Sequence, residues 1–329
     1  MKLLIVTQKV DINDSNLGFF HRWIEEFAKH YERVEVICLE KGKYNFSRNV
    51  FVSSLGKEDG RGRIFRLIRF LHLVNILRYD RVFVHMNPEY VILGGPIWHI
   101  LGMKVAFWYT HKAVNLRLRL AVRIADVIFS ASRESFRLAT RKLKIVGHGI
   151  DTELFKPSGN PTREHTVLTV GRISPTKQIK EIIEVVDMAK KQIPDLKLQI
   201  IGAPYMEKDK IYFDLIKDKA DFVGTVSNIN LPEYYGRASV FINLSNTGSL
   251  DKAVLEALAC ECQVITTNEA FRSLGSDIYV NPSSADILAK ILVDRINVGN
   301  NKSHRQYVVE NHSLSRLVTK LVSVIDSLP

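Results

Sequence analysis

Short apolar runs alternate with helical patterns along the first part of the chain. Runs of β-branched and aliphatic residues predict strands at 3–6, 34–39, 81–85, 105–109, 127–131 and 145–146. Between them, hydrophobic residues recur every three or four positions, which predicts helices from about 17 and at about 62–78, 88–101, 115–125 and 132–141. Strands that are apolar throughout and alternate with helices indicate a parallel sheet that is covered on both faces.

A polar segment at 149–165 interrupts this alternation with two prolines and two glycines. The pattern then restarts, with strands expected at 167–170, 198–201, 222–223, 240–243, 264–266 and 278–280. Helices are expected at about 176–191, 207–219, 231–236, 250–260, 285–298, 304–310 and 314–327. The chain is therefore expected to hold two doubly wound α/β domains in tandem, with ligands at the carboxyl ends of their strands.

These patterns suggest four segments. We expect an N-terminal Rossmann-like domain at 1–150, a linker at 151–165 and a C-terminal Rossmann-like domain at 166–303. The helices at 304–329 follow as a separate element that could pack back on the first domain. Two such domains facing each other would enclose a central cleft.

The charge of the chain is concentrated in its first half. Residues 1–155 hold 25 Lys and Arg against 15 Asp and Glu, a net charge of +10, and the remainder contributes +1 to the total of +11. A basic domain beside a neutral one suggests that the first domain faces anions. The hydrophobic share of 46% is typical of a globular chain.

Cysteine usage and apolar runs indicate the compartment. Cys38, Cys260 and Cys262 are too few for a disulfide framework, which favours a reducing environment. The N-terminal segment has the pattern of a first strand, and the apolar run at 90–109 is interrupted by Gly, Pro, His and Lys. We therefore expect a cytoplasmic protein without a membrane-spanning helix.

Several ligand motifs are absent from the sequence. There is no Walker P-loop, no G-x-G-x-x-G after the first strand, no D-x-D carboxylate pair and no H-E-x-x-H. We therefore expect no metal and no cofactor. RNA-binding motifs and patterns of stacking aromatic residues are also missing, so nucleic acid is not an expected partner.

The first candidate site follows a buried strand that runs into Gly171 and Arg172, with a helix expected to begin near Thr176. Glycine permits close approach of the backbone to a ligand, and the guanidinium of Arg172 together with the ammonium of Lys177 suits a diphosphate. The alternative is a helix start that Ser174 or Thr176 caps, with Lys177 on a solvated face.

The second candidate is Glu256, which lies in a helix, 250–260, that is otherwise almost entirely apolar. Lys252 shares its face at the i, i+4 spacing, so a surface salt bridge is one interpretation, although lysine before glutamate is the weaker order. The other interpretation is a lone carboxylate that accepts hydrogen bonds from sugar hydroxyls. The turn at 246–249 would present N–H groups of the helix start to an anion.

Two motifs of the second domain carry a family resemblance. They are G-R-x-S-P-x-K at 171–177 and L-E-A-L-A-C at 255–260, the latter followed by V-I-T-T-N at 264–268. Together they resemble the retaining glycosyltransferases of family 4, also described as glycosyl transferases group 1. Segments at 17–20, 108–111, 127–132 and 147–151 resemble motifs of that family's first domain. The resemblance implies the GT-B fold, in which two Rossmann-like domains surround a cleft. It also implies that the first domain, 1–150, is the acceptor side and that the second, 166–303, binds the nucleotide sugar.

The resemblance also implies a role for each matching position. Arg172 and Lys177 would neutralise the diphosphate of a nucleotide-sugar donor, and Glu256 would bind its ribose. His111 would lie near the anomeric centre and the acceptor, whereas the sequence pattern alone favours a core histidine. The backbone N–H of Gly18 would approach the phosphates. The other implied donor contacts are Gly171, Gly248, Ser249 and Leu250.

The sequence departs from the family at one expected carboxylate. The family usually carries two glutamates separated by seven residues, and counting back from Glu256 places Gly248 at the first position. Asp251 could contact sugar hydroxyls in its place. Glu261 and Cys262 stand where a Gly-Pro break is usual, and these changes bear on the identity of the donor.

Arg63, Arg66 and Arg69 recur every third residue along one predicted helix, and Phe70 continues their face. A basic and apolar face in the acceptor-side domain suits an anionic membrane surface or a lipid-linked acceptor. The alternative is a solvated basic edge on an otherwise buried helix.

We therefore expect a retaining, metal-independent hexosyltransferase that uses a nucleotide-diphosphate sugar and a glycan or lipid-linked hydroxyl acceptor. It would contribute to cell-envelope polysaccharide or glycolipid synthesis, in the cytoplasm and peripherally at the inner face of the membrane. The alternatives are a non-catalytic sugar-nucleotide-binding homologue, a GT-B sugar-nucleotide epimerase and a basic RNA-binding protein.

Overall fold

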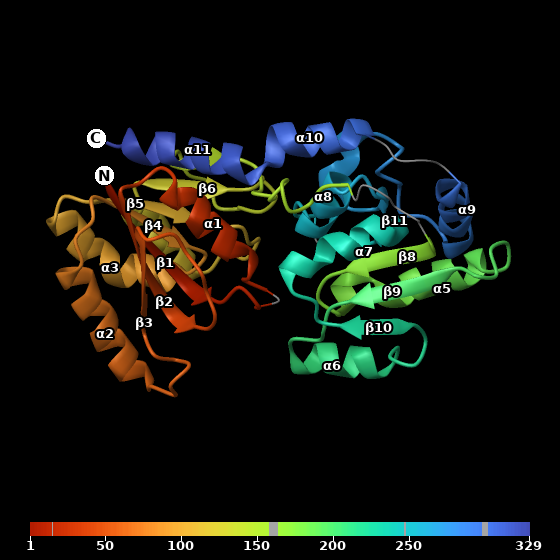
Figure 1. Cartoon of the computed structure of the whole chain (residues 1–329), viewed down its shortest axis with the longest axis horizontal. Helices are drawn as coiled ribbons and strands as arrows, with labels where there is room; N and C mark the ends of the chain where they lie inside the picture. Colours follow the sequence, from red (N-terminus) through yellow and green to blue (C-terminus); the bar gives the residue numbers. More distant parts are fainter. Residues whose placement is uncertain (15, 158–163, 247, 298–301) are drawn as a thin grey trace. The chain divides into compact units, whose positions relative to one another are not determined.

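The computed structural model describes residues 1–14, 16–157, 164–246, 248–297 and 302–329. The chain divides into two compact units, residues 1–149 with 314–329 and residues 150–313 (Figure 1). The expected linker at 151–165 includes residues 158–163, which lie outside the described residues. Each unit has its own parallel sheet and its own hydrophobic core on either side of that sheet.

The first unit contains a seven-stranded parallel sheet in the order β3-β2-β1-β4-β5-β6-β7. Its strands are β1 (Lys2–Val10), β2 (Arg33–Lys41), β3 (Val50–Ser54), β4 (Arg81–His85), β5 (Lys104–Trp108), β6 (Val127–Ser130) and β7 (Leu143–Ile145). Its helices are α1 (Phe19–Ala28), α2 (Arg63–Ile76), α3 (Pro88–Ile100), α4 (Leu116–Ile124) and α11 (Leu314–Asp326). The predicted parallel α/β class is confirmed.

Adjacent residues of β1 enter opposite cores, because successive side chains of a strand point to opposite faces. Leu3 and Ile5 pack with α1 and α11 on one face. Leu4 and Val6 pack with α2, α3 and α4 on the other. Burial on both faces explains why the central strands are apolar throughout.

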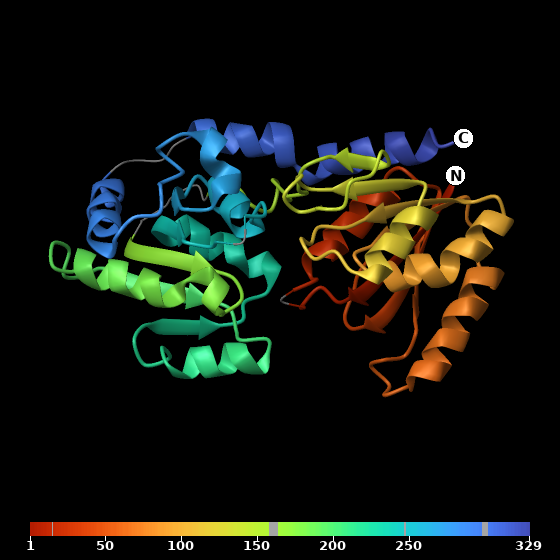
Figure 2. The ribbon, with the colours of Figure 1, turned by 180° about the vertical axis from the view of Figure 1, so that it is seen from behind.

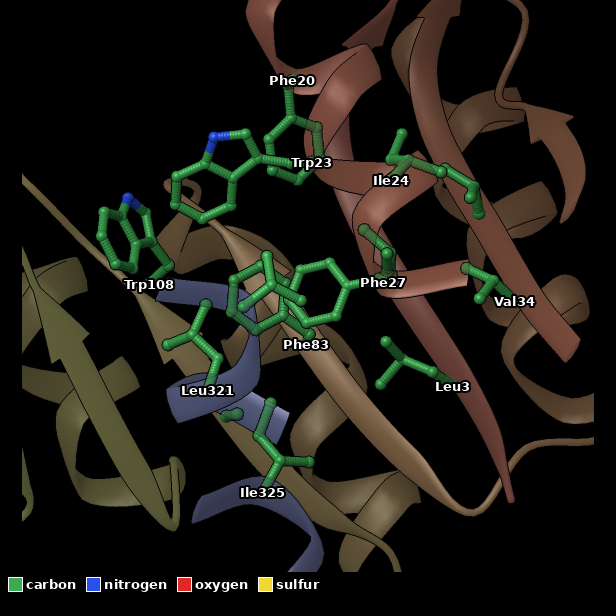
Figure 3. Close-up of a cluster of buried hydrophobic side chains, with 14 of the residues drawn as sticks. Leu3, Phe20, Trp23, Ile24, Phe27, Val34, Phe83, Trp108, Leu321 and Ile325 are labelled. Carbon is green, nitrogen blue, oxygen red and sulfur yellow. The ribbon is translucent and has the colours of Figure 1, made fainter. Parts of the chain in front are cut away.

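Helix α11 completes the core of the first unit although it follows the whole second unit in sequence. Figure 3 shows Leu321 in the same cluster as Phe27 and Phe83, whose ring centroids are 5.0 Å apart. The hydroxyl of Tyr31 donates a hydrogen bond to Asp326 Oδ1 at 2.8 Å. Residues 1–149 therefore share their core with a helix from the other end of the chain.

Three segments differ from the expected elements. β3 was not predicted, and its mostly half-exposed residues at the sheet edge explain the weak pattern. Residues 132–141 form turns and bends instead of the expected helix, although the Ser132 hydroxyl accepts the Ser135 N–H at 3.2 Å, as a helix cap would. The strand expected at 278–280 is reduced to an isolated bridge between Thr266 and Tyr279.

The second unit contains a five-stranded parallel sheet in the order β10-β9-β8-β11-β12. Its strands are β8 (Glu164–Val170), β9 (Lys197–Ile201), β10 (Asp221–Gly224), β11 (Ala238–Asn243) and β12 (Gln263–Thr266). Its helices are α5 (Ile179–Ala189), α6 (Glu207–Asp214), α7 (Leu231–Arg237), α8 (Lys252–Ala259), α9 (Ala285–Ile296) and α10 (Lys302–His312). Helices α5 and α9 pack on one face, and α7, α8 and α10 on the other (Figure 1, Figure 2).

Arg305 of α10 ties together three parts of the second unit. One guanidinium nitrogen donates to the carbonyl oxygens of Phe155, at 2.9 Å, and of Ala259. The other donates to the carbonyl oxygen of Thr152 at 3.1 Å. One of these bonds satisfies the last carbonyl of α8, the helix that carries Glu256, and the other two satisfy backbone acceptors in the segment before β8.

No helix in the described ranges is both long and apolar enough to cross a lipid bilayer.

We expect Leu321→Ala to lower the free energy of unfolding of the first unit by about 3 kcal/mol, because it leaves a cavity in the core between α1 and α11. Urea unfolding followed by tryptophan fluorescence measures this unit selectively, since Trp23, Trp98 and Trp108 all lie in it. Lys320→Ala, at an exposed position of α11, is the control and should change stability by less than about 0.5 kcal/mol. Equal effects of the two substitutions would contradict this account.

Candidate functional site

The candidate site lies at the carboxyl ends of β8 and β11 in the second unit. In the sheet order, β8 lies between β9 and β11. From β8 the chain continues to β9 on one side, and from β11 it continues to β12 on the other side, so the connections after β8 and β11 run in opposite directions. Open parallel sheets bind ligands at such a point, because the diverging connections leave space beside the strand ends. The loop after β8 carries Arg172 and Lys177, and the loop after β11 leads to Glu256.

The backbone at the exit of β8 approaches a neighbouring strand exit so closely that it requires glycine. Gly171 has a φ of +150° and Gly202, after β9, a φ of +142°. A Cβ on Gly202 would lie 1.9 Å from the carbonyl oxygen of Gly171. A Cβ on Gly171 would lie 3.3 Å from Cε of Lys177, so this glycine leaves room for the lysine side chain.

Lys177 is held by an acid from the next strand exit. It follows β8 in a short 3₁₀ helix, Pro175–Lys177, and its ammonium pairs with Oδ2 of Asp251. Asn243, the last residue of β11, donates to the same oxygen at 3.0 Å. Burial alone would raise the pKa of Asp251. The nearby Lys177 ammonium and these hydrogen bonds lower it by more than burial raises it, so the pKa of Asp251 is below its usual value.

The structure rules out the alternative of a capped helix start with a solvated lysine. Lys177 does not lie on a solvated face, since only 19% of its side chain is exposed. Ser174 and Thr176 make no cap for the 3₁₀ helix, and their hydroxyls instead lie 3.0 Å apart. The contact of Asp251 with sugar hydroxyls stays a prediction. Its oxygens accept bonds from Lys177, from Asn243 and, at 3.3 Å, from the N–H of Ala253, which does not use all the acceptor sites of a carboxylate.

Arg172 has a weaker internal contact than Lys177. Its Nε lies 3.7 Å from Oδ2 of Asp209, and 44% of its side chain is exposed. Asp209 is fully buried in the first turn of α6, where its Oδ2 accepts the N–H of Met206 at 3.1 Å. The acid can orient the guanidinium while most of the guanidinium N–H donors remain directed elsewhere.

Glu256 lies in a buried network rather than on the surface. α8 is buried on all sides from Ala253 to Ala259, and Glu256 itself is 5% exposed. Its Oε2 accepts the hydroxyl of Tyr235 at 3.1 Å, and its Oε1 lies 3.7 Å from the Lys252 ammonium. Burial raises the pKa of Glu256 and lowers that of Lys252, with each partner opposing the shift of the other.

The expectations for Glu256 are therefore corrected in two respects. The carboxylate is not alone, and the pair with Lys252 is not a surface salt bridge. Burial strengthens a pair whose sequence order is unfavourable on a solvated helix. A carboxylate has more acceptor sites than Tyr235, Lys252 and the side chain of Asn228 occupy, so hydrogen bonds to a ligand are compatible with this network.

The turn before α8 differs slightly from expectation. The helix begins at Lys252 rather than 250, and the Asp251 side chain caps it through the N–H of Ala253. Gly248 has a φ of +64°, which favours glycine, and the carbonyl of Ser249 accepts the side-chain amide of Asn268 at 2.8 Å. Thr247, part of the expected anion-binding turn, lies outside the described residues.

Two expected site residues belong to the first unit. His111 lies in the exposed loop after β5, and its Nδ1 accepts the N–H of Ala113 at 3.1 Å, so the alternative of a core histidine is wrong. Gly18 precedes α1, where a Cβ would lie 2.4 Å from the carbonyl oxygen of Asp14. The Gly18 N–H donates to that oxygen at 2.9 Å and is engaged within the loop.

Sequence reasoning missed three polar partners of these residues. Asn243 carries a usable signal, since a polar residue ending a buried strand marks the binding edge of a parallel sheet. Tyr235 and Asp209 carry none, because they reach Glu256 and Arg172 from helices that the pattern identifies only as helices. Within the described residues, no group of three His, Cys, Asp or Glu side chains is arranged to hold a metal ion.

Comparison with known proteins identifies relatives of this chain. Residues 150–273 match the family model described as Glycosyl transferases group 1. A 194-residue stretch, 54% of the chain, is 26% identical to sulfoquinovosyl transferase SQD2 of Arabidopsis thaliana and spans 34% of that protein. A 280-residue stretch, 80% of the chain, is 23% identical to an uncharacterized glycosyltransferase of Haemophilus influenzae and spans 76% of it.

Solved structures establish the fold. Anabaena HepE in complex with UDP matches all of this chain and all of its own with a TM-score of 0.72 at 15% identity. Sucrose-phosphate synthase of Thermosynechococcus elongatus matches 98% of each chain with a TM-score of 0.71 at 16% identity. The two parallel-sheet domains therefore have the GT-B fold, as expected from the sequence.

The Lys177–Asp251 pair predicts a pH-dependent stability. Because the folded-state pKa of Asp251 is depressed, its contribution is present above the unfolded value of about 3.9 and is lost as the pH falls through the folded value. We expect Asp251→Asn to lower the free energy of unfolding by about 3 kcal/mol at pH 7, and this difference to shrink below about pH 4. Urea titrations followed by circular dichroism at several pH values measure it.

The control is Asp214→Asn, which breaks an exposed pair with Lys217 in the same unit. It should cost less than about 1 kcal/mol. A difference for Asp251→Asn that stays constant from pH 7 to 3 would contradict the proposed ionic contribution.

Proposed function

Because residues 150–273 carry a group 1 glycosyltransferase domain, we propose that this chain moves a hexose from a nucleotide-diphosphate sugar to a hydroxyl acceptor. The observation that carries the proposal is the pairing of Lys177 with Asp251, which joins the exit of β8 to the start of the helix that bears Glu256. It gathers cations and a carboxylate at the switch point of one sheet, where a nucleotide binds in folds of this type.

In this proposal Arg172 and Lys177 bind the donor diphosphate. The Arg172 guanidinium is nearly half exposed, and the Lys177 ammonium is prepositioned by Asp251 beside Gly171. As the sugar–phosphate bond breaks, negative charge develops on the diphosphate, and fixed cations stabilise it without reorganisation. Two cations in this role replace a divalent metal, so we propose metal-independent transfer.

We propose that Glu256 accepts hydrogen bonds from the ribose hydroxyls. Its buried position makes a charge-assisted bond stronger than it would be in water. The neighbour HepE forms a complex with UDP, and UDP is accordingly the first nucleotide to test on this chain. Gly248, Ser249 and Leu250 would contact the donor sugar through their backbone, since Gly248 stands where the resemblance places a carboxylate.

We propose transfer with retention of the anomeric configuration. The acceptor oxygen would form its bond to the anomeric carbon on the face from which the diphosphate departs, and its proton would pass to the leaving phosphate oxygen. His111, exposed at the carboxyl end of β5, would lie near the acceptor, and Gly18 would shape the β1–α1 loop. A glycan or lipid-linked hydroxyl of the cell envelope is the proposed acceptor.

The location proposed for this reaction is the cytoplasm, at an anionic membrane surface. The three cysteines are all buried thiols, as suits a reducing compartment. α2 contains Arg63, Arg66 and Arg69 but no acidic residue, so electrostatics favours its approach to anionic lipid.

A second candidate is a non-catalytic sugar-nucleotide-binding protein, and Gly248 in place of a carboxylate is the observation that favours it. Incubation with UDP-hexoses separates the two. A transferase should release UDP and free hexose slowly to water even without an acceptor, whereas a binding protein should not. Release of an epimerised hexose would instead identify a sugar-nucleotide epimerase.

We expect Arg172→Ala and Lys177→Ala each to reduce turnover by about 100-fold or more, because each removes about 3 kcal/mol of stabilisation from the departing diphosphate. The measurement is the rate of UDP release from a UDP-hexose that the wild-type protein accepts as a substrate. The buffer contains EDTA, in which wild-type activity should persist. Lys210→Ala, at an exposed pair in α6, is the control and should retain wild-type turnover. Wild-type turnover in both site variants would show that Arg172 and Lys177 do not stabilise the departing diphosphate.

We expect Glu256→Gln to weaken UDP binding by about tenfold or more, because it replaces a charge-assisted bond worth roughly 1.5–3 kcal/mol with a neutral one. Calorimetric titration measures this, with the exposed Glu233→Gln of α7 as a control that should bind normally. Unchanged UDP affinity together with reduced stability of the ligand-free protein would show that Glu256 serves only as the structural partner of Lys252.

A further inference from the structure

The first unit contains a groove of about 420 Å³ that the proposed donor site does not use. It lies between α2 and α3, beside the carboxyl ends of β1 and β2. Its volume is within the range of pockets that hold small molecules. It therefore has the size and the position, at the binding edge of a parallel sheet, of a ligand site.

The lining of the groove is mainly apolar. Leu39 and Leu55 contribute from the sheet edge, Leu67 and Phe70 from α2, and Leu93 from α3. Leu67 and Leu93 remain 40% and 39% exposed, so the apolar surface is not covered by other parts of the first unit. A ligand with a hydrocarbon segment would bury this surface.

The rim of the groove is cationic. Arg63 and Arg66 line it, two turns and one turn before Phe70 on the same stripe of α2. The lining also includes one acid, Glu89, whose carboxylate pairs with Arg117 at 2.7 Å. Within the described residues, no carboxylate forms an ion pair with Arg63 or Arg66, so the two arginines outnumber the one lining acid, which is already paired. Forked guanidiniums that lack an internal acid are suited to bind a phosphate.

Arg69 differs from these two arginines. It is exposed on α2 but does not line the groove. The three arginines therefore do not form one functional face as their spacing suggested. Arg63 and Arg66 belong to the groove, and Arg69 supplies a matched arginine on the same helix outside it.

We propose that the groove between α2 and α3 binds a phosphate-bearing lipid, with the phosphate on Arg63 and Arg66 and the hydrocarbon chain along Leu39, Leu67, Phe70 and Leu93. As an assignment of the acceptor class it rests on the proposed function, since the bound lipid would present the hydroxyl to be glycosylated. The exposed Ile64 and Ile68 of α2, 76% and 63% exposed, extend the apolar surface beyond the groove and would contact neighbouring lipid.

The test is a titration of the full chain with 1-oleoyl-lysophosphatidate below its micellar concentration, followed by calorimetry and tryptophan fluorescence. Trp98 reports on the groove, because its ring lies edge-to-face with Phe70 at 6.4 Å. We expect saturable binding at least tenfold tighter than that of monoolein, which lacks the phosphate. Inorganic phosphate alone, which lacks the chain, should bind at least tenfold more weakly than the lysophosphatidate.

Matched variants locate the site. Arg63→Gln with Arg66→Gln, and separately Leu93→Gln, should each weaken lysophosphatidate binding about tenfold or more. Arg69→Gln and Ile68→Gln should leave the affinity for this single lipid within twofold of wild type. Circular dichroism verifies folding, and unchanged UDP affinity in every variant shows that the second unit is intact.

Three outcomes would overturn the proposal. Equal affinity for monoolein and lysophosphatidate would show that the groove does not recognise the phosphate. Equal binding of inorganic phosphate would show a free-anion site instead of a lipid site. An equal loss in Arg69→Gln and in the groove variants would show general attraction of lipid to α2. Absence of UDP binding to the wild-type chain, in contrast, would contradict the proposed function and leave the lipid result standing.

Discussion

The structure depends on the exclusively parallel pairing of both sheets. Parallel strands must be joined by crossover connections, so helices cover both faces and every strand ends at the same edge. In the second unit this constraint brings the exit of β8, with Gly171, next to the exit of β11, with Asn243. In the first unit it brings the ends of β1 and β2 to the groove beside α2. Both candidate sites therefore follow from one rule of strand geometry.

The two edges differ in chemistry. At the edge of the second unit, Lys177 pairs with the mostly shielded Asp251 and Lys252 pairs with the buried Glu256, so that little net charge is buried. Pairing matters because an uncompensated buried charge costs several kcal/mol. At the edge of the first unit, Arg63 and Arg66 have no such acid in the described structure and border an apolar surface. This contrast fits the sequence, in which nearly all the net positive charge lies before residue 156.

Hydrophobic periodicity determined most of the fold. The central strand Arg81–His85 was predicted to the residue, because its interior is buried on both faces and is therefore apolar. The prediction was wrong at 132–141, which forms turns and bends, and at β3, where partial burial weakens the pattern.

The sequence by itself determined which residues could carry charge to the strand ends, since Arg172, Lys177 and Glu256 follow directly from the order of strands and helices. Only the tertiary structure decided their partners. Asp251 lies 74 residues after Lys177, and Tyr235 reaches Glu256 from a different helix. Likewise only the structure separated Arg63 and Arg66 from Arg69. The physical reason is that periodicity reports how each segment meets the core, whereas a side-chain pair depends on which segments the sheet places side by side.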